Sequence, residues 1–132
     1  MGAPAASGNS TVVATDTHVV LVPSGGGPIP TPLPHAFAGQ LNGGLVASVT
    51  IAGQAAAVVG SSASNRPPHI PTPPGTSFQR APADRGQIAV GSATVRIGGQ
   101  AAARAGDAVT TCNDPADAPV GRVVAAGTVR IG

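Results

Sequence analysis

The sequence has very few large hydrophobic side chains. Among its 132 residues there is no Trp or Tyr, and there are only two Phe and one Met. A hydrophobic core must therefore be thin and built mainly from Val, Ile and Ala. No run of about 18 apolar residues occurs, so we expect no membrane-spanning helix. Residues 1–17 lack a basic start and a continuous apolar run, so we expect synthesis in the cytoplasm without a signal peptide.

Charge is also sparse, which excludes one class of partner. The chain has no Lys and no Glu, and its seven Arg, each isolated in the sequence, are set against five Asp for a net charge of +2. A nucleic-acid interface needs clustered positive charge or aromatic residues that stack on bases. The sequence offers neither, so we expect no nucleic-acid partner.

Glycine and proline are abundant instead. There are 19 Gly and 14 Pro, a quarter of the chain, a level at which sequences without a repeat are often disordered. A disordered Pro/Gly-rich linker is therefore one interpretation, which far-UV circular dichroism would test.

An internal repeat favours an ordered β-fold. Residues 50–57 read TIAGQAAA and residues 96–103 read RIGGQAAA, 46 positions later, and a third copy begins at residues 127–132. Each copy predicts a short strand, a Gly-containing turn and a second strand of small residues. Val49–Ile51 and Thr94–Ile97 are the strands that we expect first. Gly, Pro and β-branched residues in every window of ten exclude long helices.

Two proline-rich stretches separate the repeats. Residues 29–32 and residues 70–73 both read Ile-Pro-Thr-Pro, and each has a histidine nearby. Proline fixes φ and donates no backbone hydrogen bond, so we expect two stiff, extended loops. A polyproline linker or an SH3-type ligand is the alternative.

The chain holds four residues of the kinds that bind zinc most often, namely His18, His35, His69 and Cys112, and they are its whole stock of His and Cys. Three imidazoles and one thiolate make a complete tetrahedral set. Four protein ligands leave no position for a reactive water, so the predicted Zn²⁺ is structural. A small domain that is short of core gains stability from such a staple.

A small zinc-dependent hydrolase is the competing hypothesis. It needs an open metal position and a general base, which in a chain without Glu would be Asp16 or Asp114. Both are more simply interpreted as turn residues, Asp114 because it precedes Pro115. We therefore expect no enzyme activity.

Residues 91–107, GSATVRIGGQAAARAGD, followed by Cys112, resemble the signature of PAAR-repeat proteins. The shared features are a Gly-Ser strand, an Ile-Asn-Gly-type turn, the word Pro-Ala-Ala-Arg, and Gly-Asp before a metal-binding Cys. Two departures occur: Ala101 stands at the Pro of that word, and the first copy has Ser61 in place of Asp. The likeness spans nearly the whole chain.

The resemblance implies a fold and a function. The fold is an all-β cone of short hairpins with pseudo-threefold symmetry and a zinc near its apex, held by His18, His35, His69 and Cys112. A flat base would seat on a trimeric VgrG-like spike, one tip per trimer, and sharpen it for membrane puncture during contractile injection. Cargo effectors would be further partners, and contact with the target membrane would be transient.

The resemblance also indicates a setting. Residues 68–73 (PHIPTP) and 112–115 (CNDP) are most similar to the tips of extracellular, phage-tail-like injection particles, and less so to type VI secretion effectors. We expect a single domain over residues 1–132, in which residues 1–16 could form a flexible N-terminal segment, with no C-terminal toxin extension.

Overall fold

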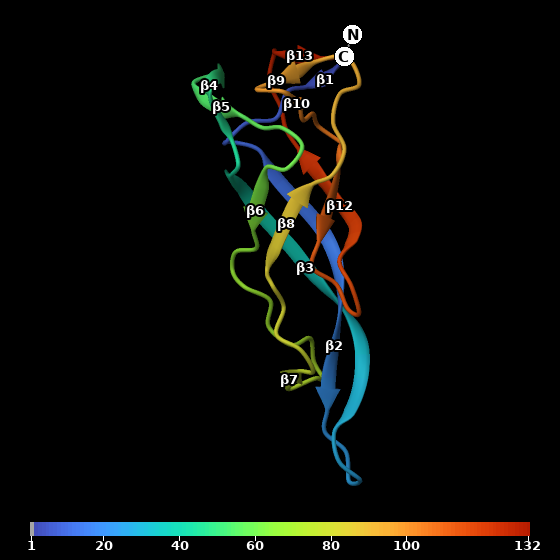
Figure 1. Ribbon diagram of the computed structural model, residues 1–132. Helices are drawn as coiled ribbons and strands as arrows, with labels where there is room; N and C mark the ends of the chain where they lie inside the picture. The colour runs from blue at the N-terminus through green and yellow to red at the C-terminus, as the bar shows by residue number, and fades with distance from the viewer. Residues whose placement is uncertain (1) are drawn as a thin grey trace.

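The computed structural model describes residues 2–132 as an elongated, all-β needle (Figure 1). No helix occurs in this range, so the predicted fold class is confirmed. The strands, in chain order, are β1 (Ala3–Pro4), β2 (Thr11–Val22), β3 (Ile29–Gly43), β4 (Val46–Ile51), β5 (Gln54–Ala56), β6 (Ser62–Ser64), β7 (Ser77–Phe78), β8 (Arg85–Ile88), β9 (Arg96–Ile97), β10 (Gln100–Ala101), β11 (Ala108–Thr111), β12 (Ala118–Val124) and β13 (Arg130–Ile131).

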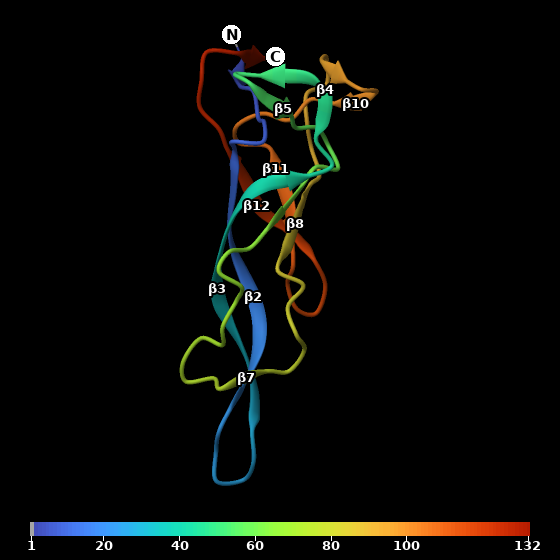
Figure 2. The same cartoon turned by 90° about the vertical axis from the view of Figure 1, so that its left-hand side faces the viewer.

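Six of these strands close a barrel in the described part of the chain. The antiparallel order is β2, β3, β6, β8, β11 and β12, and β12 returns to pair with β2. The β2–β3 ladder outruns the others, because it continues from Thr11–Gln40 to Val22–Ile29. Its far end projects from the barrel opposite the two chain ends (Figures 1 and 2). Within residues 2–132, only short β7 pairs with this projection, at Val20 and Leu21 of β2.

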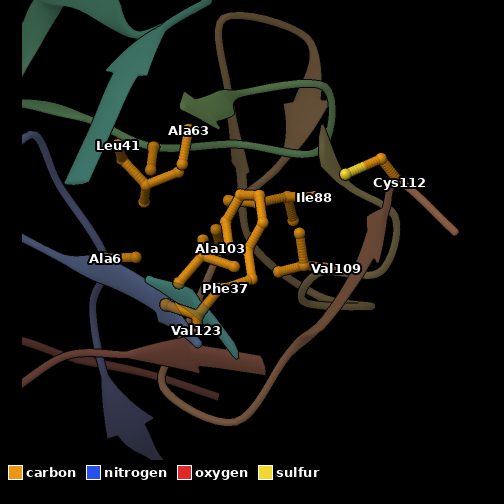
Figure 3. Close-up of a cluster of buried hydrophobic side chains, with 11 residues drawn as sticks. Ala6, Phe37, Leu41, Ala63, Ile88, Ala103, Val109, Cys112 and Val123 are labelled. Atoms are coloured by element: carbon orange, nitrogen blue, oxygen red, sulfur yellow. The ribbon is translucent and has the colours of Figure 1, made fainter. Parts of the chain in front are cut away.

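The core of the barrel is thin, as the composition predicts. Its largest fully buried apolar side chains are Phe37, Leu41 and Ile88, and the rest of the buried cluster consists of small alanines and valines and Cys112. Figure 3 shows this cluster with Cys112 at its edge. Residues 2–16 contribute to it through Ala6 and Val12, and they include β1 and the first half of β2.

Three two-stranded arms form the end of the needle that we call the base. They are β4–β5, β9–β10 and β13–β1. The first two turn at Ala52-Gly53 and Gly98-Gly99, all with positive φ. The third arm has no turn, because its strands come from opposite ends of the chain, with Ala3 paired to Ile131. The third repeat copy is thus completed by the N-terminal segment.

A ring of backbone hydrogen bonds relates the three arms. Ala6 N donates to Ala103 O at 3.0 Å, Ala103 N donates to Ala57 O at 3.0 Å, and Ala57 N donates to Ala6 O at 3.1 Å. All three alanines are fully buried. The ring fits only small side chains at these positions, and it gives the base its pseudo-threefold symmetry.

Two local expectations need correction. Val49–Ile51 lies within β4 as predicted, but the strand expected at Thr94–Ile97 begins at Arg96. The Ser92 hydroxyl accepts hydrogen bonds from the backbone N–H groups of Thr94 and Val95, and this turn displaces the strand start.

The first proline-rich stretch is also not a loop. Residues 70–73 are irregular, as predicted, but residues 29–34 belong to β3. The prolines at 28, 30, 32 and 34 occupy alternate positions. In an antiparallel pair, alternate N–H groups face away from the partner, so these prolines cost no hydrogen bond to β2.

Candidate metal centre

The fold brings the four predicted ligands to one region, where the projecting hairpin leaves the barrel. His18 lies on β2, His35 lies on β3 opposite Asp16, His69 lies in the loop between β6 and β7, and Cys112 follows β11. The ring centroids of His18 and His69 are 4.9 Å apart, and His35 lies 5.5 Å from His18 and 5.6 Å from His69. Segments far apart in the sequence therefore meet at the predicted residues.

A fifth residue, Asp16, joins this group. Potential ligand atoms of Asp16, His18, His69 and Cys112 all lie within 4.8 Å of one another, and we call these four residues the metal centre. Asp16 is not the turn residue that the sequence suggests: it lies inside β2, fully buried. Alternate residues of a strand share a face, so Asp16 and His18 point to the same side. The two-residue spacing of Asp16 and His18 in a strand was the sequence signal that could have identified Asp16 as part of the site.

Asp16 is bound on both oxygens. Its Oδ2 lies 2.9 Å from Nε2 of His69, and its Oδ1 accepts a hydrogen bond from the hydroxyl of Thr111. A buried carboxylate is costly unless it is paired in this way. The carboxylate also supplies negative charge at the point where a cation would sit.

His35 lies beside the metal centre but is engaged elsewhere. Its Nδ1 is 2.9 Å from the carbonyl of Leu33, to which it donates, and its Nε2 accepts the backbone N–H of Thr72 at 3.1 Å. Burial lowers the pKa of His35, as do the neighbouring His18 and His69, so the ring is neutral at pH 7. A neutral imidazole whose Nδ1 is held by a carbonyl is the form that binds metals through Nε2.

Cys112 is a buried, free thiol. Its Sγ lies 3.6 Å from Asp16 Oδ2 and 3.6 Å from His18 Nε2. Burial is the main reason that the pKa of Cys112 is raised to about 11. The side chain alone is therefore protonated at neutral pH, and a bound cation would favour the thiolate.

The loop after Cys112 fixes His18. Asn113 Oδ1 accepts the N–H of Thr17 at 2.6 Å, and Asp114 Oδ2 accepts the N–H of Val19 at 2.8 Å. His18 Nδ1 is buried without a hydrogen bond, and it faces Asp114 Oδ2 at 3.5 Å. Burial alone would raise the pKa of Asp114, but the Val19 N–H and Arg80 outweigh it and lower that pKa. The ionised carboxylate can orient His18 as a metal-bound imidazole is oriented.

Both phenylalanines of the chain shield this region from water. The Phe78 ring centroid lies 5.3 Å from His35 and 5.9 Å from His18, and the Phe37 centroid lies 6.2 Å from His69. A dry shell of this kind strengthens the interaction of a cation with its ligands. Two imidazoles, a thiol and a carboxylate, with a third imidazole alongside, are a donor set that suits zinc.

Comparison with known proteins agrees with the repeat and the metal centre. The family model for the PAAR motif matches residues 22–116, well over half of the chain. The chain belongs to the PAAR-motif family. A search of curated proteins and a search of solved structures each gave no significant match. PAAR-motif proteins are structural spike tips of contractile injection systems.

In this PAAR-motif protein, the sequence reasoning found the third repeat copy at residues 127–132 but missed the N-terminal half of its arm. The matched range contains the arms β4–β5 and β9–β10, whereas β13–β1 and His18 lie outside it. Yet residues 4–6 read Pro-Ala-Ala, the start of the family word, and Ser10 closes that arm as Asp107 closes the second repeat. The signal, Pro-Ala-Ala at residues 4–6, lies at the N-terminus, whereas the strand β13 that it completes lies at the C-terminus.

Proposed function

We propose that this protein is the tip of a contractile injection spike, and that it caps a trimeric VgrG-like spike protein as a single copy. The observation that carries the proposal is the ring formed by Ala6, Ala57 and Ala103. Three quasi-equivalent arms within one chain let a monomer offer a similar surface to each subunit of a threefold partner. One tip would then seat on three spike chains.

The surface of the base supports docking. The short arms leave strand edges on which a partner can add backbone hydrogen bonds. Exposed Val49 and Val129 lie in or beside these arms and offer apolar contact. Arg96 and Arg130 of the arms carry positive charge, whereas the equivalent position in the first arm is Thr50.

Native mass spectrometry of the tip mixed with its spike protein tests this proposal. We expect one tip per three spike chains. Val129→Asp should weaken the complex, because it places a charge on a base residue that is 46% exposed in the free protein. Ile29→Asp is the matched control at the opposite end, with 52% exposure, and should leave the complex intact. A complex of three tips with three spike chains, or no complex, would contradict the capping model.

We propose further that one structural Zn²⁺ is held by His18, His69 and Cys112, with His35 as the fourth ligand. The hydrogen bond from His35 Nδ1 to the Leu33 carbonyl leaves Nε2 as the donor atom, which would exchange the Thr72 N–H for the metal. Asp16 would then neutralise the charge of the site and orient His69. Bound zinc would supply rigidity to the distal half of the barrel.

Metal analysis of purified variants separates the two candidates for the fourth ligand. The wild-type protein should carry one zinc per chain, and a Co²⁺-loaded sample should give the intense visible spectrum of a tetrahedral thiolate site. His35→Ala should reduce the metal content, whereas Asp16→Asn should keep the spectrum. Full metal retention in His35→Ala together with loss in Asp16→Asn would identify Asp16 as the ligand instead.

The setting of the protein is a further proposal, supported by the likeness of residues 68–73 and 112–115 to the tips of extracellular, phage-tail-like injection particles. We propose that the protein is assembled into an injection particle of this kind, where it could help dock cargo effectors. In residues 2–132 no helix is long and apolar enough to cross a membrane. We propose that the tip contacts the target membrane transiently during injection. Co-purification of the tip with particle components would test this assignment.

A further inference from the structure

The projecting end of the β2–β3 ladder has a composition unlike the rest of the surface. We call residues 19–33 the distal hairpin. No charged residue occurs between His18 and His35. Beyond the β7 pairing the hairpin presents Val22, Ile29 and several prolines, and Ile29 is 52% exposed. The nearest charges are Asp16, Asp114 and Arg80, the ion-pair partner of Asp114, and they lie at the level of the metal centre.

The backbone of the distal hairpin has few free hydrogen-bond donors. On the β3 side, the prolines at 28, 30, 32 and 34 remove every N–H that would face away from β2. On the β2 side, Val19 N–H is bound by Asp114, and the carbonyls of Val19 and Leu21 accept from Gln79 and Thr76. The outward edge of β3 is therefore free of N–H donors, and the outward carbonyls of Val19 and Leu21 on β2 are paired.

Hydrogen bonds within the turn at the end satisfy two of its N–H groups. Gly27 N donates to Ser24 O at 3.1 Å, Gly26 N donates to Ser24 Oγ at 3.3 Å, and the Ser24 hydroxyl donates to Gly27 O at 2.6 Å. Pro23 and Pro28, which flank the turn, have no N–H to satisfy. In lipid, every unsatisfied backbone donor costs free energy, so the small number of free N–H groups in the hairpin suits a non-aqueous environment.

We propose that the distal hairpin partitions into the lipid bilayer of the target, so that this apolar hairpin is the membrane-contacting element of the tip. The inference rests on the proposed spike-tip function and names the element and the chemistry of its contact. A protein partner that adds a strand is disfavoured, because the proline edge offers it no N–H. The scarcity of free N–H donors and the absence of charge together favour lipid.

The length of the distal hairpin limits how deeply it can enter the bilayer. Gly25 in the turn lies four positions after Leu21, the last β2 residue paired with β7. At about 3.3 Å per residue, the turn lies about 13 Å beyond that pair. The hydrocarbon core of a bilayer is about 30 Å thick, so the hairpin reaches through about one leaflet. Deeper entry would bring the charged groups around the metal centre into lipid.

Single-tryptophan variants of the zinc-loaded, full-length protein test this directly, because the natural chain has no Trp or Tyr. Ile29→Trp should shift its emission to shorter wavelength with vesicles of zwitterionic phosphatidylcholine, and brominated acyl chains should quench it. Val129→Trp, in the base, should do neither. No shift in Ile29→Trp, or equal quenching of both probes, would overturn the proposal.

A charge introduced into the apolar hairpin completes the test. In the Ile29→Trp background, Val22→Asp should weaken partitioning about tenfold or more, because an aliphatic side chain leaves lipid and a charge replaces it. Val124→Asp, on the barrel wall with 49% exposure, makes the same change in net charge and should have no effect. Unchanged partitioning in Val22→Asp, or binding only to vesicles that contain a membrane protein, would overturn the proposal.

Failure here is distinguishable from failure of the capping model. Val22→Asp should retain zinc and still form the complex of one tip with three spike chains. If the spike complex is absent while Ile29→Trp partitions, the capping model fails and the lipid contact stands. If the complex forms and Ile29→Trp stays in water, only the lipid contact fails.

Discussion

At the base, three buried alanines close a ring of backbone hydrogen bonds, whereas at the other end of the barrel the strands converge on the side chains of the metal centre. The residues that follow the ring alanines differ freely: Ser7, Val58 and Arg104. The ring uses backbone groups, which nearly all residues share, so the base restricts the size of the side chains at the ring more than their chemical identity. The metal centre constrains identity, because each of its buried polar atoms needs a specific partner.

Removal of the metal should have the largest effect and should separate the two ends. A structural zinc site can supply about 10 kcal/mol or more of apparent binding free energy. With the proposed zinc chelated, we expect a sharply lower melting temperature and early loss of amide protection in β2 and β3 near the metal centre. Hydrogen exchange followed by mass spectrometry measures this, with the ring amides as the internal control. Equal loss of protection at both ends would show one cooperative unit and break the comparison.

Overpacking of the ring should come next. Ala57→Leu forces a larger side chain into a position with no exposed surface, which costs about 1–3 kcal/mol of the free energy of unfolding, or more. Urea denaturation of the zinc-loaded protein measures the change. Ala126→Leu, at an exposed position, is the control and should be nearly neutral. The base would not depend on small residues if the two variants proved equally stable.

The smallest effect should arise where the arms differ. Asp107 Oδ2 accepts the N–H of Arg104 at 2.7 Å, and Ser10 and Ser61 serve the same backbone role in the other two arms at 3.0 Å. Asp107→Ala should therefore cost about 1 kcal/mol, whereas Asp107→Ser should cost less. Thermal unfolding of both variants checks this. A larger loss in Asp107→Ser than in Asp107→Ala would mean that the three turns are not equivalent.

The sequence allowed the prediction of features that depend on local pattern. The repeated word predicted two arms of the base, and the scarcity of large side chains predicted a thin core, as Phe37 and its alanine neighbours confirm. The His and Cys stock led to the region of the metal centre, because few residue types bind zinc. These inferences needed no knowledge of which segments meet in space.

Other features depend on contacts between distant segments, and there the sequence was insufficient. Asp16 resembles any turn aspartate until His69 and Cys112 approach it from other parts of the chain. Proline usually indicates a loop, and only the pairing of β3 with β2 shows that alternate prolines fit a strand edge. The N-terminal half of the third arm was missed because a repeat is searched for in linear order, whereas this one begins at residue 127 and finishes at residue 10.

The meeting of the chain ends in one arm makes the fold suited to circular permutation. β1 pairs with β13, and Arg130 Nη1 donates to the carbonyl of Gly2 at 3.1 Å, so a short peptide could join Gly132 to Gly2. New termini could then be opened at the Gly98-Gly99 turn, where a side chain at Gly99 would meet nothing within 4 Å. The three arms make equivalent hydrogen bonds in the ring, so the base does not depend on which arm contains the chain termini. A permuted chain should therefore assemble the same base.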